Sequence, residues 1–265
     1  MSVLVAATSE DGQYKPPTIG EFFPGELLFA NTPFAVTRIN LIMMLMTGLL
    51  CLFFVIAFRK PQIVPRGIQN LGEMLVDFVR VQIAEEILGH HAKRFLSYLT
   101  SLFFMLLFFN IAAILPLIHL SATSVIGVPL LMSLITWVIY NYVGFKKHGI
   151  GGYFKMNLFP PGVPKPIYVI VAPIEFATVA ILRPVTLTIR LMANMMSGHL
   201  LLVLFFSATS FFLLESQGLF KAFAVPSYVM GLAFTLFEIL IAFLQAYIFT
   251  LLTAVYIQMS LSEEH

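Results

Sequence analysis

Four side chains within two long apolar stretches of this sequence are able to steer or carry charge. Arg190 and His199 lie in the first stretch, and Glu238 and Gln245 lie in the second. An arginine inside a membrane costs about 2.5–3.5 kcal/mol on insertion scales, and its guanidinium cannot escape by losing a proton. A chain that keeps such a charge in lipid usually needs it to meet another charge. The pattern therefore predicts a functional charge inside a membrane.

Polar residues recur beside this arginine at helical spacing. The members of the stripe are separated by four, four and three residues and share one face of a helix: Thr186, Arg190, Asn194 and Ser197. Arg183, seven residues before Arg190, is expected to continue it. Glu238 and Gln245 are also seven residues apart, so they share a face of the last helix. One long helix thus presents a fixed positive charge, and the other presents a titratable carboxylate.

Structural roles stay open as alternatives for several of these residues. The hydroxyls of Thr186 and Ser197 can bond to their own helix backbone. Asn194 and Gln245 can serve only to hold helices together, and His199 can be a polar group satisfied in the protein interior.

Three charged residues have structural alternatives of their own. Arg190 can form a structural ion pair with Glu238. Glu175 and Arg183, near the start of the same apolar stretch, can pair with each other or extend to the membrane interface.

Composition places the chain in a membrane. Of its 265 residues, 59% are hydrophobic and 11% are charged, whereas soluble domains carry about 25% charged residues. The formal net charge of +2 gives no indication of nucleic-acid binding. The single cysteine, Cys51, cannot form an internal disulfide. His90 and His91 are adjacent and would point apart on a helix, so we predict no metal site and no cofactor.

The apolar runs predict an all-α integral membrane protein with about five crossing helices and one amphipathic surface helix. The expected segments are a polar tail at 1–38, a first membrane helix at 39–58, the amphipathic helix at 67–92, a membrane hairpin at 95–145, a polar loop at 146–166, and two long helices at 167–262. The amphipathic helix either lies on the membrane surface or packs on a neighbouring subunit. No internal repeat is evident.

The last two helices are too long to stand upright in a bilayer. The apolar segment at 167–214 would span about 72 Å as a straight helix, against a hydrocarbon core of about 30 Å. The segment at 222–261 is likewise too long to cross the bilayer as an upright helix. We therefore expect both helices to be strongly tilted or bent, as if wrapped around a curved partner.

Basic residues set the expected orientation. The connections after 58 and after 145 are rich in lysine and arginine, whereas the tail at 1–38 is acidic on balance. The N-terminus is therefore expected outside the membrane and the C-terminus in the cytoplasm.

In these residues the sequence resembles subunit a of the F-type ATP synthases, the stator of a membrane rotor. The family motif is an arginine and a leucine, two small or apolar residues, an asparagine and then a glycine; here it reads Arg190-Leu191-Met192-Ala193-Asn194 with Gly198. The preceding stretch PIEFATVAILRPVTL and the last helix, with Glu238 and then Gln245, also match. The resemblance covers roughly residues 67–262 and is specific as a combination.

The resemblance implies roles for individual residues. Arg190 corresponds to the essential arginine that faces a ring of small proteolipid subunits, each with one carboxylate. Asn194 and Gln245 flank it, Glu175 lies in the matching stretch ahead of it, and His199 and Glu238 match a pair of proton-path positions. The resemblance also implies a peripheral-stalk subunit and the other ATP synthase subunits as partners, and no bond chemistry by this chain itself.

The sequence departs from the family near the outer mouth of the expected path. Many members carry an acidic residue three positions after the asparagine that matches Asn110, whereas this chain has Ala113. His119 is a candidate substitute because it lies close by in the sequence. Its replacement by leucine should lower proton flux if it serves this role.

Three alternatives stay open at this point. The first is a sodium-translocating version of the same subunit, and the second is a secondary ion or anion transporter in which Arg190 binds substrate. The third is a structural membrane scaffold. We expect a bacterial plasma membrane, with the mitochondrial inner membrane as the alternative location.

Overall fold

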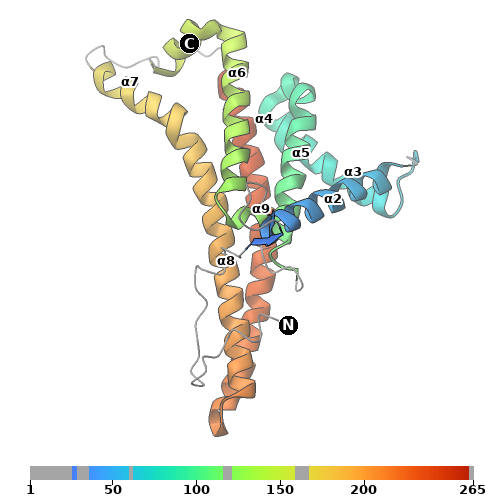
Figure 1. Cartoon of the computed structure of the whole chain (residues 1–265). Helices are drawn as coiled ribbons and strands as arrows, with labels where there is room; N and C mark the ends of the chain where they lie inside the picture. Colours follow the sequence, from blue (N-terminus) through green and yellow to red (C-terminus); the bar gives the residue numbers. More distant parts are fainter. Residues whose placement is uncertain (1–25, 29–35, 60–61, 116–120, 159–166, 263–265) are drawn as a thin grey trace. The chain divides into compact units, whose positions relative to one another are not determined.

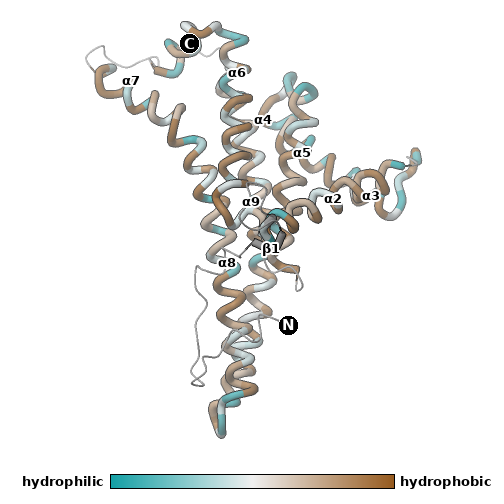
Figure 2. The backbone as a smooth tube through the Cα atoms, in the orientation of Figure 1, coloured by the Kyte–Doolittle hydropathy of each residue, from teal (hydrophilic) through white to brown (hydrophobic). Residues whose placement is uncertain are grey.

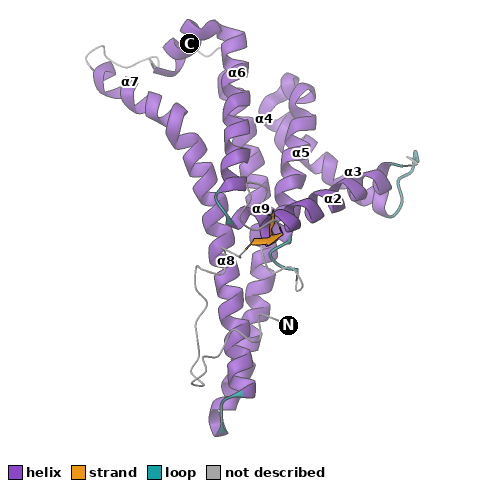
Figure 3. Cartoon of the chain, viewed as in Figure 1, coloured by secondary structure: helices purple, strands orange, loops and turns teal. Residues whose placement is uncertain are grey.

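The computed structural model describes residues 26–28, 36–59, 62–115, 121–158 and 167–262, and most of these residues lie in helices (Figure 3). Five helical stretches are long and apolar enough to cross a membrane: Arg38–Phe58, Ile68–Ile111, Gly127–Leu158, Tyr168–Leu214 and Gly218–Leu261. The prediction of an all-α membrane protein with five such helices is therefore confirmed. The described part also contains two short antiparallel strands, β1 (Glu26–Leu28) and β2 (Val36–Thr37).

The helices follow one another along the chain with few breaks (Figure 1). In order they are α2 (Arg38–Phe58), α3 (Ile68–Val79), the π-helical turn η2 (Arg80–Glu85), α4 (Glu86–Leu88), the 3-10 turn η3 (Gly89–His91), α5 (Ala92–Ile111), the 3-10 turn η4 (Ala122–Ser124), α6 (Gly127–Leu158), α7 (Tyr168–Ala177), the π-helical turn η6 (Thr178–Leu182), α8 (Arg183–Leu214), the 3-10 turn η7 (Gly218–Phe223) and α9 (Ala224–Leu261).

The chain forms two compact units. The first comprises Met1–Thr47, Leu107–Val125 and Met192–Leu244, and the second comprises Gly48–Leu106, Ile126–Leu191 and Gln245–His265. Helices α2, α5, α8 and α9 each contribute to both units.

In the first unit, α8 and α9 lie side by side through aromatic packing (Figure 1). The rings of Phe205 and Phe234 stack with centroids 5.0 Å apart. Gly231 lets the helices approach, since a Cβ there would lie 3.3 Å from the ring of Phe206. The Ser227 hydroxyl donates to the Phe205 carbonyl oxygen at 3.1 Å. Small residues and interhelical hydrogen bonds are the usual means of holding helices together in lipid.

In the second unit, α6 has polar contacts with its neighbours. Tyr98 of α5 and Thr136 of α6 are hydrogen-bonded through oxygens 2.9 Å apart. The rings of Tyr140 and Tyr256 bring α6 against α9, with centroids 5.7 Å apart. Lys147 also donates to the carbonyl oxygen of Leu261, the last residue of α9. A cation there complements the negative end of the helix dipole.

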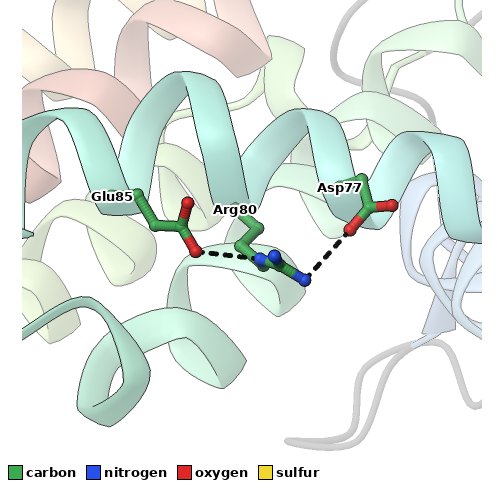
Figure 4. A network of polar contacts seen from close by, with 3 residues as sticks. All are labelled: Asp77, Arg80 and Glu85. Atoms are coloured by element: carbon green, nitrogen blue, oxygen red, sulfur yellow. Dashed lines mark hydrogen bonds and ion pairs between the residues drawn. The ribbon is translucent and has the colours of Figure 1, made fainter.

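The predicted amphipathic segment is helical and bears an exposed ion-pair network. Arg80 Nε lies 2.9 Å from Glu85 Oε1, and Arg80 Nη1 lies 3.4 Å from Asp77 Oδ1 (Figure 4). Gly72 packs against α2, because a Cβ there would lie 3.3 Å from the Cβ of Ala57. Several large apolar side chains on this segment are exposed: Ile68, Leu71, Met74 and Val81. This apolar face is consistent with both expected environments, a lipid surface and a neighbouring subunit.

The expected polar loop at 146–166 is wrong over its first part, because α6 is helical as far as Leu158. Gly149 breaks the helix with φ 70° and ψ 166°, a conformation that glycine adopts at little steric cost. Beyond the break, the ring of Tyr153 packs directly onto Gly144, where a Cβ would overlap it. The Tyr153 hydroxyl donates to Asn141 Oδ1 at 3.0 Å. A packed aromatic ring therefore orders this lysine-containing segment; residues 159–166 lie outside the described part.

The long C-terminal stretches contain many hydrophobic residues, which are brown in Figure 2. Tyr168–Leu214 runs for 47 residues without an interruption of the helix. In an apolar 18-residue segment of this stretch, 22% is buried within the chain. At about 1.5 Å per residue this stretch is more than twice as long as a hydrocarbon core of about 30 Å is thick. Its exposed apolar side chains must therefore meet lipid or other proteins.

Candidate functional site

The first unit contains a buried carboxylate. Glu238 of α9 is 2% exposed, and no donor among the described residues bonds to either of its carboxylate oxygens. Gly198 of α8 lies directly against it, because a Cβ at Gly198 would be 2.9 Å from Glu238 Oε1 and 3.2 Å from its Cδ. A charged carboxylate in such a place is costly. Glu238 is therefore suited to accept a proton.

His199 adjoins this contact in the sequence. It follows Gly198 on α8 and is 5% exposed. The absence of a side chain at Gly198 is what lets the carboxylate of α9 approach the helix that carries the imidazole. The first unit thus contains both residues that the sequence predicts for a proton path.

The same unit contains a buried polar cluster that was not predicted from the sequence. Asn110 is fully buried and its amide donates to the carbonyl oxygen of Ala242 on α9 at 3.4 Å. Thr123 donates to Asn110 Oδ1 at 2.8 Å, and Ser121 Oγ lies 2.6 Å from Thr123 Oγ1. The run Ser121-Ala122-Thr123-Ser124, which follows a helix containing an asparagine, was the available signal. Ala113 is 1% exposed in this unit.

Arg190 belongs to the second unit and its side chain is exposed on α8. It forms no ion pair with any described residue. Two other members of the predicted stripe bond to their own helix: Thr186 donates to the Leu182 carbonyl oxygen at 2.7 Å, and Ser197 donates to that of Asn194 at 3.1 Å. The structural alternative is confirmed for these two hydroxyls.

Arg183, which was expected to continue the Arg190 stripe, lies on the same helix but is buried. Buried residues on α8 recur every four positions: Arg183, Leu187, Leu191, Met195 and His199. Seven residues on a helix are only about 20° short of two full turns, so Arg183 and Arg190 lie on nearly the same side of α8, where Arg183 is buried and Arg190 is exposed. The guanidinium of Arg183 is 5.8 Å from the ring centre of Tyr140 and 5.1 Å from that of Tyr256.

The remaining candidates differ in burial and surroundings. Glu175 lines a cavity of about 440 Å³ in the second unit, together with Trp137 and Asn141. It forms no ion pair with Arg183 in the described part of the chain. Gln245 is 2% exposed, and Asn194 is half-buried. His119 lies outside the described residues.

These residues are chemically suited to transferring protons and to attracting a negatively charged group. It offers a buried acid, a buried imidazole near it in the same unit, and an exposed cation on one of the same helices. The described residues contain no group of three or more His, Cys, Asp or Glu able to hold a metal ion.

Comparison with known proteins agrees with these features. The family model described as ATP synthase A chain matches residues 41–258. ATP synthase subunit a of Rhodococcus erythropolis is 48% identical over 267 residues, covering 100% of this chain and 96% of that protein. The subunit a proteins of a Parafrankia species and a Nocardioides species are 41% and 36% identical, over 97% and 98% of this chain and 86% and 98% of their own lengths. The chain therefore belongs to the ATP synthase subunit a family and is a multi-pass membrane protein.

Proposed function

We propose that this chain is the proton-translocating stator subunit of an F-type ATP synthase. It provides two offset half-channels for protons and presents Arg190 to the carboxylates of a rotor ring. It performs no bond chemistry itself and couples proton flow to rotation, which drives ATP synthesis in a separate catalytic head.

One observation carries this proposal: Glu238 is buried against Gly198, with no donor from the described residues at its carboxylate. A permanently charged structural carboxylate would require partners at that depth. A carboxylate that alternates between its neutral and charged forms does not need a fixed partner. His199, the second titratable group of this unit, extends the route.

The mechanism follows from the charges. A proton enters from outside through a hydrated path lined by His199 and Glu238, and it neutralises a carboxylate of the ring. The neutral carboxylate can then rotate into lipid, because burial disfavours its charged form. After nearly a full turn it meets a second path, open to the cytoplasm, and releases the proton. Each proton contributes about 2.3 kcal/mol per 100 mV of membrane potential.

Arg190 keeps these two paths apart in this proposal. Its side chain is exposed on the surface of this chain, where a ring helix can reach it. Ala193 and Ser197 are also exposed farther along α8. Small side chains beside an exposed cation allow a neighbouring helix to approach closely. The cation attracts an ionised ring carboxylate and repels a proton, so it blocks direct leakage.

The other partners and the orientation complete the proposal. The ring of small proteolipids meets α8 and α9, and a peripheral-stalk subunit holds the chain against the torque. The N-terminus lies outside a bacterial plasma membrane and the C-terminus lies in the cytoplasm. The exposed apolar residues on α3 supply a further surface for lipid or for a neighbouring subunit.

The direct test is Glu238→Gln in the assembled complex. ATP-driven proton pumping should fall by more than tenfold in inverted membrane vesicles, and the pH profile of the remaining flux should change. Glu215→Gln is the matched control, because Glu215 is exposed beyond the end of α8. Unchanged flux and an unchanged pH profile for Glu238→Gln would overturn the assigned path. Flux that requires sodium would instead indicate the sodium-translocating version.

A further inference from the structure

The helix that carries Arg190 contains a π-helical turn, η6, just ahead of α8. The backbone N–H of Arg183 donates to the carbonyl oxygen of Thr178, five residues earlier. The next donor in the same register would be residue 184, which is a proline without an N–H. The carbonyl oxygen of Val179 therefore lacks a donor from its own helix.

Two side chains of α6 bond to this carbonyl oxygen. Trp137 Nε1 donates to the oxygen of Val179 at 3.1 Å, and the hydroxyl of Tyr140 donates to the same oxygen at 2.9 Å. A carbonyl oxygen can accept two such bonds through its two lone pairs. Tyr140 is 1% exposed and Val179 is 9% exposed, so the oxygen would be costly to leave unbonded there.

A second contact joins the same two helices beyond the π turn. Ser133 Oγ lies 2.6 Å from Thr188 Oγ1, two residues before Arg190. Ser133, Trp137 and Tyr140 are spaced by four and three residues and therefore lie on one face of α6. This face contacts the arginine helix both at the π turn and just ahead of Arg190.

A π turn changes the direction in which a helix presents its side chains. It holds one extra residue relative to a regular α-helix, and one residue corresponds to about 100° of rotation around the axis. The bonds that maintain the π turn thus determine which residues of α8 are buried and which are exposed. Arg183 is buried and Arg190 is exposed with the π turn in place.

We propose that Trp137 and Tyr140 are positioning residues for Arg190. By bonding to the Val179 carbonyl oxygen they maintain the π turn, and they thereby fix the rotation with which α8 presents its arginine. This inference rests on the proposed function of Arg190 as the rotor-facing charge, but it concerns how this chain holds that residue.

The test removes both donors and leaves a phenyl ring at each position. In the assembled complex, Trp137→Phe combined with Tyr140→Phe should lower ATP-driven proton pumping about tenfold, the factor expected when a buried polar group loses its partners. Each single variant should cause a smaller loss, since the other donor remains. Tyr142→Phe is the matched control, because Tyr142 lies on the same helix and is 59% exposed; it should pump normally.

A disulfide separates positioning from general stability. Ser133→Cys and Thr188→Cys, in a Cys51→Ser background, should form a bridge under oxidation because the parent oxygens are 2.6 Å apart. In the variant without the two donors, the bridge should restore most of the pumping, and reduction should abolish the gain. A loss of bulk packing would not respond in this way.

Two outcomes would overturn the inference: the double variant pumps normally, or the disulfide bridge forms but does not restore pumping. If the double variant fails to assemble, Tyr140→Phe alone decides, and pumping equal to that of Tyr142→Phe would contradict the proposal. Arg190→Ala distinguishes a failure of this inference from a failure of the proposed function. Coupled pumping by Arg190→Ala would contradict the proposed function. If Arg190→Ala is inactive but the positioning test fails, the proposed function still stands.

Discussion

Gly198 and Glu238 are in direct contact across two helices, and the contact exists only because residue 198 has no side chain. A Cβ at Gly198 would lie 2.9 Å from Glu238 Oε1 and 3.4 Å from its Cγ. Real Cβ atoms do not tolerate the shorter distance, so any larger residue at 198 must displace the carboxylate. The glycine of the arginine motif is thus explained in this chain by the space that the Glu238 carboxylate occupies beside it.

Gly198→Ala should therefore impair proton movement while the complex still assembles. Overpacking costs about 1–3 kcal/mol, and the cost here lies at the low end because the displaced atom is the end of a flexible side chain; the displaced carboxylate should lower ATP-driven pumping about tenfold or more. Gly48→Ala provides the comparison, since a Cβ at Gly48 in α2 would meet nothing within 4 Å. Pumping by Gly198→Ala at the level of Gly48→Ala would show that the contact has no functional importance.

The buried cluster around Asn110 should contribute to stability. Thr123→Val removes the hydroxyl that donates to Asn110 Oδ1 at 2.8 Å, and it leaves a fully buried amide oxygen without that partner. The expected cost is about 1–3 kcal/mol, measurable as a lower dissociation temperature of the purified complex.

Thr178→Val is the control for this prediction. Among the described residues, its hydroxyl donates to the carbonyl oxygen of Ile174 in its own helix, and that bond is exposed. Equal dissociation temperatures for the two valine variants would contradict the importance of the cluster. A loss of pumping by Thr123→Val at an unchanged dissociation temperature would place the cluster in the proton path itself.

Replacement of Arg183 should affect stability rather than pumping, unlike replacement of Arg190. Arg183→Met removes a cation that lies over the rings of Tyr140 and Tyr256, at a cost of about 2 kcal/mol for a desolvated pair. The dissociation temperature should fall, while coupled pumping per assembled complex is largely retained. Arg183→Lys keeps the charge and should lie between Arg183→Met and the parent. Pumping abolished by Arg183→Met in fully assembled complex would contradict this division of roles.

Much of the architecture could be predicted from the sequence because membrane helices must be long and apolar. The apolar run at 39–58 coincides with α2 to within one residue, because length and hydropathy alone define such a helix. The segment at 146–158 was misjudged because lysines and glycines suggested a loop, whereas the Tyr153 ring packed on Gly144 stabilises a helix there.

The candidate site was less accessible to prediction, for a physical reason. The types of Arg190, His199 and Glu238 indicated charge and proton chemistry, since those properties belong to single residues. The contact of Gly198 with Glu238 depends on how two helices pack. The carbonyl oxygen at the π turn of Thr178–Leu182 is bonded by donors on α6, which are distant in the sequence. The sequence signal for it was Pro184, which cannot donate a backbone hydrogen bond. The burial of Arg183 could not be predicted from its spacing to Arg190, because it depends on the rings of Tyr140 and Tyr256 that pack on its guanidinium.

Arg190→Ala tests most directly whether Arg190 is the charge at the rotor interface, as we propose. ATP-driven pumping and passive proton flux would be measured in vesicles that contain the assembled variant complex, with Arg183→Lys as the comparison. We expect coupled pumping and ATP synthesis to stop while the ring remains bound, and a proton leak through the joined paths to appear. Coupled pumping that survives in Arg190→Ala would contradict this proposal and would make the arginine a structural residue.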